Sequence, residues 1–225
     1  MSANFQERKF VIFDLDGTLI DSSEDIANAQ IYAISSVSGI SPDQLDRQKL
    51  ASLLGKGLVE TFLPFLSPEQ HHLIPLMIET YRSFYSDNLT TYTRVFPGMP
   101  ELMADLKAAG RITAVATTKY FSTTERLVEH FGLKPYLDFV QGTDHDSFPL
   151  KPDPYILNLL LQRANLTATD TLMIGDTDND VLCAQRAGVA SIGVTWGAWG
   201  EVALAQLGPD GIAHNVQQLR AMILA

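Results

Sequence analysis

The sequence predicts an α/β fold with a doubly wound parallel sheet and an all-helical domain inserted near its start. Three observations carry this prediction. An apolar run at residues 10–13 is typical of a buried strand. Beyond residue 92, further runs of this kind alternate with helical patterns, which is the arrangement of a parallel sheet covered by helices. Between these two parts, residues 22–92 show helical patterns and no convincing strand.

The strands are expected in order along the chain. Residues 10–13, FVIF, are continuous in Val, Ile and Phe, as in a strand buried on both faces. Four further apolar runs are expected to be strands at residues 112–118, 137–142, 171–176 and 190–196. Helices are expected at residues 100–110, 121–132, 153–164 and 180–188, and three of them end in glycine, a common helix stop. Glycine and proline near residues 208–211 indicate only a loop before a last short helix.

The segment from residue 22 to residue 92 is expected to be a small helical domain. Loops longer than about 12–15 residues are uncommon in compact domains, so a segment of this length needs structure of its own. Ser22 followed by Asp25 resembles a capping box at the start of its first helix. The expected division is a core domain of residues 1–17 and 93–225, with residues 18–92 as the helical insertion.

Composition and charge exclude several classes of function. The formal net charge is -10 and no basic run is present, which argues against a nucleic-acid partner. The single cysteine, Cys183, rules out an internal disulfide framework and is expected to be a small buried residue on a helix. No stretch approaches the ~18 apolar residues of a membrane span, and the polar N-terminus lacks a signal-sequence core. We therefore expect a cytoplasmic protein without a membrane partner.

Two carboxylates, Asp14 and Asp16, follow directly after the first expected strand. Side chains alternate along an extended chain, so these two point to the same side if the extended geometry persists through Leu15. Two anions held close together repel each other and raise a pKa unless a positive charge lies between them. The sequence therefore indicates a cation, a proton or a catalytic task at this point.

Polar side chains also follow the later strands. Ligands of doubly wound sheets bind at the carboxyl ends of the strands, near the point where strand order reverses. Carboxylates and hydroxyls at such an edge suit a hard cation such as Mg²⁺, and a lysine offers a charge for an anionic substrate. Any one of these acids alone is most often a helix cap or turn residue, but their joint occurrence favours a site. The residues in this set are Asp14, Asp16, Thr117, Thr118, Lys151, Asp176, Asp178 and Asp180.

The motifs together resemble the haloacid dehalogenase-like (HAD) hydrolase superfamily, and within it the phosphoglycolate phosphatase-like group. The resemblance is carried by DLDGTLIDS at residues 14–22, the strand ending in Thr117, Lys151 in KPDP, and GDTDND at residues 175–180. The stretches FPGMPELMADLKAAG, KPDPYIL and WGAWGE also read like that group. The resemblance covers nearly the whole chain. It implies a Rossmann-like core and a helical cap formed by the insertion.

The resemblance implies a catalytic role for the first two carboxylates. Asp14 is then the nucleophile that forms an aspartyl-phosphate. Asp16 is the general acid that protonates the leaving group and afterwards the base that activates water. The metal is Mg²⁺, held by Asp14, the backbone carbonyl of Asp16 and Asp176, with Asp180 nearby.

The resemblance also implies which residues bind the substrate. Thr117 and Lys151 hold the phosphoryl oxygens, and the backbone at Gly17 adds an anion-binding nest. Thr118 stands where many members of the group have Asn, and it is expected at the substrate. The cap is expected to select the substrate through LLGKGL at residues 53–58, with Lys56 between two glycines. The alternative for Lys56 is a solvated lysine at a helix end.

Three functions are compatible with these residues. The first is a Mg²⁺-dependent phosphatase acting on a small phosphorylated metabolite, such as 2-phosphoglycolate or a sugar phosphate. The second is a β-phosphoglucomutase-like isomerase, although DGT at residues 16–18, in place of the DGV frequent among the mutases, favours hydrolysis. The third is a non-catalytic binding protein, which the complete set of catalytic residues disfavours. The sequence leaves open whether the protein is a monomer or a homodimer.

Overall fold

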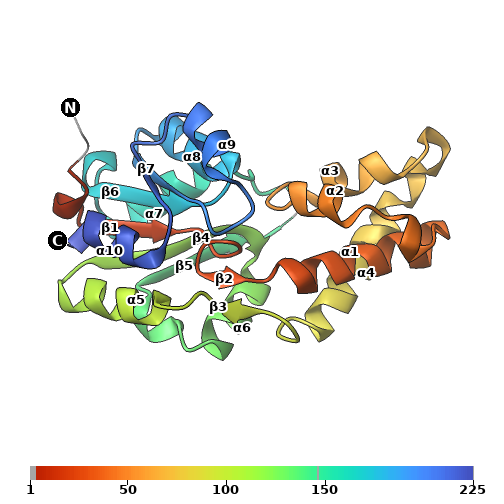
Figure 1. Ribbon diagram of the computed structural model, residues 1–225, viewed down its shortest axis with the longest axis horizontal. Coiled ribbons are helices and arrows are strands. Elements are labelled where there is room, and N and C mark those ends of the chain that lie inside the picture. Colours follow the sequence, from red (N-terminus) through yellow and green to blue (C-terminus); the bar gives the residue numbers. More distant parts are fainter. Residues whose placement is uncertain (1–3, 146, 225) are drawn as a thin grey trace. The chain divides into compact units, whose positions relative to one another are not determined.

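The computed structural model of the chain describes residues 4–145 and 147–224 (Figure 1). The chain forms two compact units, one of Met1–Asp21 with Val95–Ala225 and one of Ser22–Arg94. The insertion predicted from the sequence was residues 18–92. The difference arises because residues 18–20 form a turn that stays with the first unit: the N–H groups of Leu19 and Ile20 both donate to the carbonyl oxygen of Leu15, at 2.9 and 3.0 Å.

The first unit is built on one parallel sheet of six strands. The strand order is β5-β4-β1-β6-β7-β8, and every neighbouring pair is parallel. The central strand β1 pairs on both sides, with Ile12 opposite Ala114 and Met173. The strands are β1 (Phe10–Phe13), β4 (Ile112–Tyr120), β5 (Phe139–Thr143), β6 (Thr171–Gly175), β7 (Ala190–Val194) and β8 (Gly211–Ala213).

The predicted doubly wound parallel sheet is confirmed, with one strand that was missed. The chain winds outward from β1 through β4 and β5, then returns to the other side of β1 and winds outward through β6, β7 and β8. Strand order therefore reverses at β1, where ligands of such sheets bind. A loop near residues 208–211 was the only feature expected before the last helix, and strand β8 was not expected. It is an edge strand because its backbone pairs with β7, Gly211 opposite Ile192, and its own three residues carry no pattern that reveals this.

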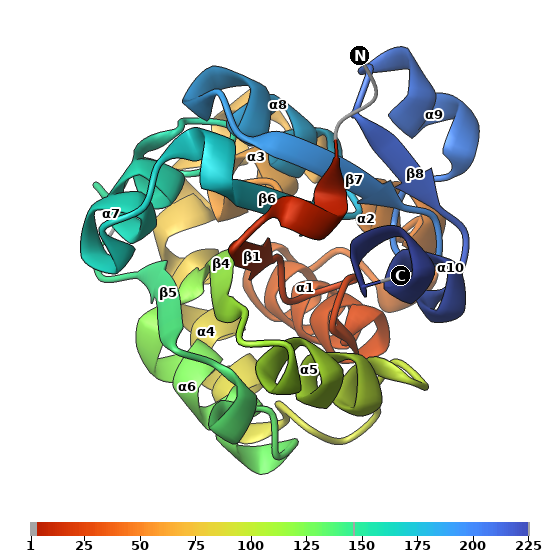
Figure 2. The same cartoon turned by 90° about the vertical axis from the view of Figure 1, so that its left-hand side faces the viewer.

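Helices cover both faces of this sheet. In Figure 2, α7 and α8 lie on one face and α5 and α10 on the other. The glycines that were expected to stop three helices do so with left-handed φ angles: 72° at Gly110, 67° at Gly132 and 68° at Gly188. The helices are α5 (Met99–Ala108), α6 (Phe121–His130), α7 (Tyr155–Ala164), α8 (Asp178–Ala187), α9 (Glu201–Gln206) and α10 (Val216–Leu224), with short 3-10 turns η1 (Phe5–Glu7), η5 (Lys134–Tyr136) and η6 (Ala168–Asp170).

The core on the α7 and α8 side is apolar and closely packed. Phe10 and Ile12 of β1 and Met173 of β6 are fully buried there, against side chains of α7 and α8. Cys183 belongs to the same cluster, and burial raises the pKa of its thiol to about 12. The expectation that Cys183 is a small buried residue on a helix is confirmed. With its pKa raised in this way, the thiol is not a nucleophile at neutral pH.

The second unit is helical. Its longest helices, α1 and α4, pack against each other, with the rings of Tyr32 and Phe84 stacked at 4.2 Å between centroids. Its helices are α1 (Ser23–Ser38), α2 (Arg47–Ser52), α3 (Leu58–Phe62) and α4 (Ile74–Asp87), with 3-10 turns η2 (Pro42–Gln44), η3 (Leu63–Phe65) and η4 (Pro68–Leu73). Strands β2 (Ile20–Asp21) and β3 (Arg94–Val95) form a two-stranded sheet where the chain passes between units.

No helix in the described ranges meets the length and hydropathy of a membrane span.

The start of α1 differs from the expected capping box. Ser22 is the residue before the helix, but its side chain makes no capping hydrogen bond. The carboxylate of Asp25 accepts hydrogen bonds from the backbone N–H groups of Tyr92 and Thr93 and, at 2.7 Å, from the Thr93 hydroxyl. Asp25 therefore connects the beginning of the second unit to its end. A partner 68 residues away explains why a local motif did not reveal this.

Candidate active site

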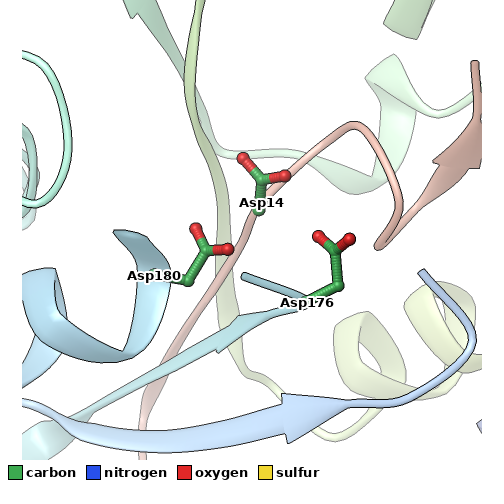
Figure 3. Close-up of side chains that lie close together, drawn as sticks. All are labelled: Asp14, Asp176 and Asp180. Carbon is green, nitrogen blue, oxygen red and sulfur yellow. The ribbon is translucent and has the colours of Figure 1, made fainter. Parts of the chain in front are cut away.

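Three carboxylates converge at the carboxyl end of β1 and β6. Asp14 directly follows β1, Asp176 directly follows β6, and Asp180 lies in the first turn of α8. Figure 3 shows the three side chains close together, with their carboxyl groups pointing to the same side. One oxygen of each lies within 4.8 Å of the others, and the exposed fractions of the residues are 7%, 1% and 1%. The parallel sheet explains this meeting, because β1 and β6 are neighbours and end at the same edge.

Lys151 places one positive charge between two of these carboxylates. Its Nζ donates to Oδ1 of Asp14 and to Oδ1 of Asp180, each at 2.6 Å, and to the carbonyl oxygen of Ala116 at 2.9 Å. Burial lowers the pKa of Lys151, but the two carboxylates outweigh it and raise the pKa above its ordinary value. The ammonium group therefore stays protonated beside Asp14.

The carboxylates carry more negative charge than this lysine balances. Burial raises the pKa of Asp14 well above its ordinary value, against the lowering effect of Lys151. Burial and the neighbouring Asp180 raise the pKa of Asp176 to about 7, against two hydrogen bonds that lower it. Buried anionic oxygens with unbalanced charge are the donor set of a hard divalent cation. The residues present therefore fit a Mg²⁺ ion.

Asp180 is held in place by the start of α8. Its Oδ2 accepts hydrogen bonds from the N–H of Thr177 at 3.0 Å and the Thr177 hydroxyl at 2.8 Å, which is a capping box. Its other oxygen, Oδ1, accepts from Lys151. These contacts support a role in positioning Lys151. The expected role of Asp180 at the metal stays a prediction.

Two glycines make room for the carboxylates. Gly17 has a φ of 82°, in the left-handed region, and a Cβ on it would lie 2.1 Å from Oδ2 of Asp176. A Cβ on Gly175 would lie 2.2 Å from Cγ of Asp180. Real Cβ atoms do not approach so closely, so a side chain at either position would displace a carboxylate of the site. The role expected for the Gly17 backbone in anion binding stays a prediction.

Asp16 contacts a lysine that the sequence analysis missed. Nζ of Lys119 lies 3.1 Å from Oδ1 of Asp16, and both side chains are largely buried. Strand β4 runs to Tyr120, two residues beyond its expected end, with a shift of register between Ala116 and Tyr120. This extension carries Lys119 to Asp16. The sequence did offer one signal for this contact, because Lys119 directly follows the two threonines at the expected end of the strand.

Residues 116 and 117 near the end of β4 contact both lysines of the site. The hydroxyl of Thr117 accepts a hydrogen bond of 3.3 Å from the N–H of Lys119, and the preceding carbonyl, of Ala116, accepts from Lys151. Thr117 is buried, whereas Thr118 is half-buried. Lys56 lies in the second unit, between α2 and α3. The substrate-binding roles of Thr117, Thr118, Lys151 and Lys56 stay predictions.

We expect substitution of Lys119 by Met to lower kcat/KM by roughly 10–100-fold, because it would misplace Asp16, the predicted general acid and base, and a shift of about 1 Å in a reacting group has an effect of that order. Met keeps the apolar stem but removes the charge that holds Asp16. Steady-state kinetics on any turned-over phosphate ester would measure the loss, and Lys119→Arg should retain more activity. Lys107→Met is the matched control, since Lys107 pairs with Asp138 on the surface. Equal activities of the two Met variants would contradict the role of Lys119.

Known proteins of similar sequence match this chain along most of its length. The family described as haloacid dehalogenase-like hydrolase matches residues 11–194. A probable phosphatase, IndB, of Dickeya dadantii is 37% identical over 193 residues, which cover 84% of this chain and 82% of the relative. A phosphoglycolate phosphatase of Vibrio vulnificus is 33% identical and the match covers 97% of both chains. A pyrophosphatase, PpaX, of Bacillus velezensis is 30% identical and the match covers 93% of both.

A solved structure of a similar protein has the same architecture. A hydrolase of the haloacid dehalogenase-like family from Streptococcus pneumoniae matches with a TM-score of 0.85 at 28% identity, over 96% of this chain and 98% of that one. The resemblance predicted from the motifs is therefore confirmed. Because the family match runs from β1 to the end of β7, through both units, this chain belongs to the haloacid dehalogenase-like hydrolase family.

Proposed function

We propose that this enzyme is a Mg²⁺-dependent phosphatase that hydrolyses the phosphate monoester of a small metabolite through an aspartyl-phosphate. The observation that supports this most is the contact between Asp14 and Lys151 beside Asp176 and Asp180. It combines a carboxylate nucleophile, a fixed ammonium charge for phosphoryl oxygens and an anionic oxygen set for a divalent cation. The phosphatase names of the relatives support the same reaction class.

In the first step, an oxygen of Asp14 attacks the phosphorus atom. The new bond joins Asp14 to the phosphoryl group, and the bond from phosphorus to the alcohol oxygen of the substrate breaks. Asp16 gives its proton to the departing oxygen, so that an alcohol leaves instead of an alkoxide. Lys151 lies beside Asp14 and supplies a positive charge to the transferring group, whose negative charge is the main obstacle to attack.

In the second step, water replaces Asp14 at the phosphorus atom. Asp16, now a carboxylate, accepts a proton from the attacking water. The bond between phosphorus and Asp14 breaks, inorganic phosphate leaves and both carboxyl groups regain their starting states. Nζ of Lys119 lies 3.1 Å from Oδ1 of Asp16 and can donate to that oxygen whether or not Oδ2 carries the proton, which keeps the acid and base near the path of the leaving oxygen and the water.

The Mg²⁺ ion is expected between Asp14, the backbone carbonyl of Asp16 and Asp176, with Asp180 in support. Bound there, a divalent cation would neutralise phosphoryl charge and orient the substrate. Three buried carboxylates beside the single ammonium group of Lys151 support this placement, because a divalent cation would balance their charge.

The substrate is proposed to be a small phosphorylated metabolite, and the names of relatives suggest two chemical classes. One relative is a phosphoglycolate phosphatase and another a pyrophosphatase, so a compact carboxylated ester and a phosphoric anhydride are the first candidates. Residues 18–92 are proposed to act as the cap that selects between them, with Lys56 as a specificity residue. The expected cytoplasmic location also stays a prediction.

We expect purified enzyme to release phosphate from one or a few members of a substrate panel, and only with Mg²⁺. The panel contains 2-phosphoglycolate, several sugar phosphates and pyrophosphate, each assayed with Mg²⁺ and with EDTA. A preferred ester would name the substrate class, and a preference for pyrophosphate would replace the monoester in the proposal. Conversion of glucose 1-phosphate to glucose 6-phosphate without phosphate release would instead identify a mutase. Turnover that EDTA leaves unchanged would contradict the metal requirement.

A further inference from the structure

A loop after β7 holds the carboxylate of Asp176. The loop spans residues 195–200, between β7 and α9, and the N–H of Ala198 donates a hydrogen bond of 2.7 Å to Oδ2 of Asp176. From the other side, the hydroxyl of Thr18 donates a hydrogen bond of 3.1 Å to Oδ1. Each oxygen of Asp176 therefore has one donor that fixes its direction. The stretch WGAWGE, which begins in this loop, had no role predicted from the sequence.

The loop fits against Asp176 because residue 197 is a glycine. A Cβ on Gly197 would lie 2.2 Å from Oδ2 of Asp176 and 2.4 Å from the carbonyl oxygen of Gly17. A Cβ on Gly17 would lie 2.1 Å from the same Oδ2. Two glycines therefore approach the Asp176 carboxylate closely, and a side chain on either of them would move it.

Trp196 fastens this loop to the turn that carries Thr18. Its Nε1–H donates a hydrogen bond of 3.2 Å to the carbonyl oxygen of Thr18, the residue whose hydroxyl binds Asp176. The indole ring also packs edge-to-face on Phe96 at 6.4 Å between centroids. The N–H of Phe96 in turn donates to the carbonyl oxygen of Leu19, at 3.1 Å. Trp196 is therefore attached to the Thr18 turn both directly and through Phe96.

We propose that Trp196 and Gly197 are positioning residues for Asp176 as a ligand of the Mg²⁺ ion. This inference rests on the proposed function, because it requires Asp176 to bind Mg²⁺. An ionised carboxylate has about four lone-pair sites, so one hydrogen bond on each oxygen leaves acceptor capacity for a cation. The donors decide where the remaining lone pairs point. Partners that orient a metal ligand in this way typically change metal affinity by about 10–100-fold when they are substituted.

Trp196→Phe tests this proposal, because Phe keeps an aromatic ring against Phe96 and removes the Nε1–H donor. We expect the Kd for Mg²⁺, measured by calorimetry on the whole chain, to rise about 10-fold. The Mg²⁺ concentration that half-saturates phosphate release should rise by the same factor, and kcat at saturating Mg²⁺ should return close to the wild-type value. Trp199→Phe is the matched control from the same loop, and its Kd for Mg²⁺ should equal that of the wild type.

A double variant tests whether Trp196 acts through Thr18. Thr18→Val keeps the shape of the side chain and removes the hydroxyl that binds Asp176. Each single substitution is expected to raise the Kd for Mg²⁺ by some factor. If the two residues act on Asp176 together, the double variant should raise the Kd by less than the product of these two factors. Losses that simply multiply would overturn the route through Thr18.

The remaining outcomes separate this inference from the proposed function. If Trp196→Phe binds Mg²⁺ with the same Kd as the wild type, the inference is overturned and the proposed function still stands. If Trp196→Phe has a lower melting temperature without Mg²⁺ but an unchanged Kd for Mg²⁺, the role of Trp196 is purely structural, and the inference is overturned in that case as well. A wild-type chain that does not bind Mg²⁺ would overturn the proposed metal site and the inference together.

Discussion

Phosphate release should fall by about 10⁴-fold or more in Asp14→Asn, because loss of a covalent nucleophile removes the pathway that the other residues serve. The amide oxygen of Asn is nearly isosteric with the carboxylate oxygen but is a far weaker nucleophile toward phosphorus. Its Oδ1 can still accept the hydrogen bond from Lys151, which also keeps its second carboxylate partner, Asp180. The variant should therefore remain folded, with a melting temperature close to that of the wild type.

The measurement is phosphate release by purified Asp14→Asn at saturating substrate and Mg²⁺. Mass spectrometry of the sample should accompany it, because deamidation of Asn would regenerate Asp14 and imitate residual activity. Asp43→Asn is the matched control, since Asp43 is exposed in η2, and it should keep full activity. Clear turnover by Asp14→Asn that is free of deamidation would show that Asp14 is not the nucleophile.

Asp176→Asn should remove the stabilisation that Mg²⁺ gives to the folded protein. At a Mg²⁺ concentration of about 100 times Kd, binding to the folded state alone adds about 2.7 kcal/mol to the free energy of unfolding. For a protein of this size, that corresponds to a rise in Tm of about 5–10 °C. The wild type should show such a rise by calorimetry, and Asp176→Asn should show little of it.

Without Mg²⁺, the same substitution should change how stability depends on pH. The pKa of Asp176 is raised from 3.8 to about 7 in the folded protein, first by burial and then by Asp180. The folded state thus prefers the protonated acid, and its ionisation lowers stability as the pH rises through about 7. The Tm of the wild type in EDTA should therefore rise as the pH is lowered from 8 to 6, and the Tm of Asp176→Asn should change less.

Asp178→Asn is the control for both measurements. It removes one negative charge from the first turn of α8, two residues after Asp176, but Asp178 is not one of the three converging carboxylates. It should keep the rise in Tm with Mg²⁺. If Mg²⁺ stabilised Asp176→Asn as much as the wild type, Asp176 would not be a metal ligand.

The sequence alone was sufficient for the elements whose signal is local. The run at residues 10–13, the alternation beyond residue 92 and the glycines after helices gave the parallel sheet, because burial on both faces and helix termination leave marks within a few residues. The acids after β1 and β6 were found for the same reason. Once parallel strands are inferred, their carboxyl ends must meet at one edge, so Asp14 and Asp176 could be placed together before any contact was known.

Only the tertiary structure decided the contacts between distant segments. The Thr18 hydroxyl and Asp176 are 158 residues apart, and Trp196 and the Thr18 carbonyl are 178 apart. Neither pair has a pattern in its own stretch of sequence. Lys119 reaches Asp16 only because β4 extends past a shift in register. The physical reason is that short-range preferences select helices and strands, whereas the packing of the whole chain selects which side chains meet.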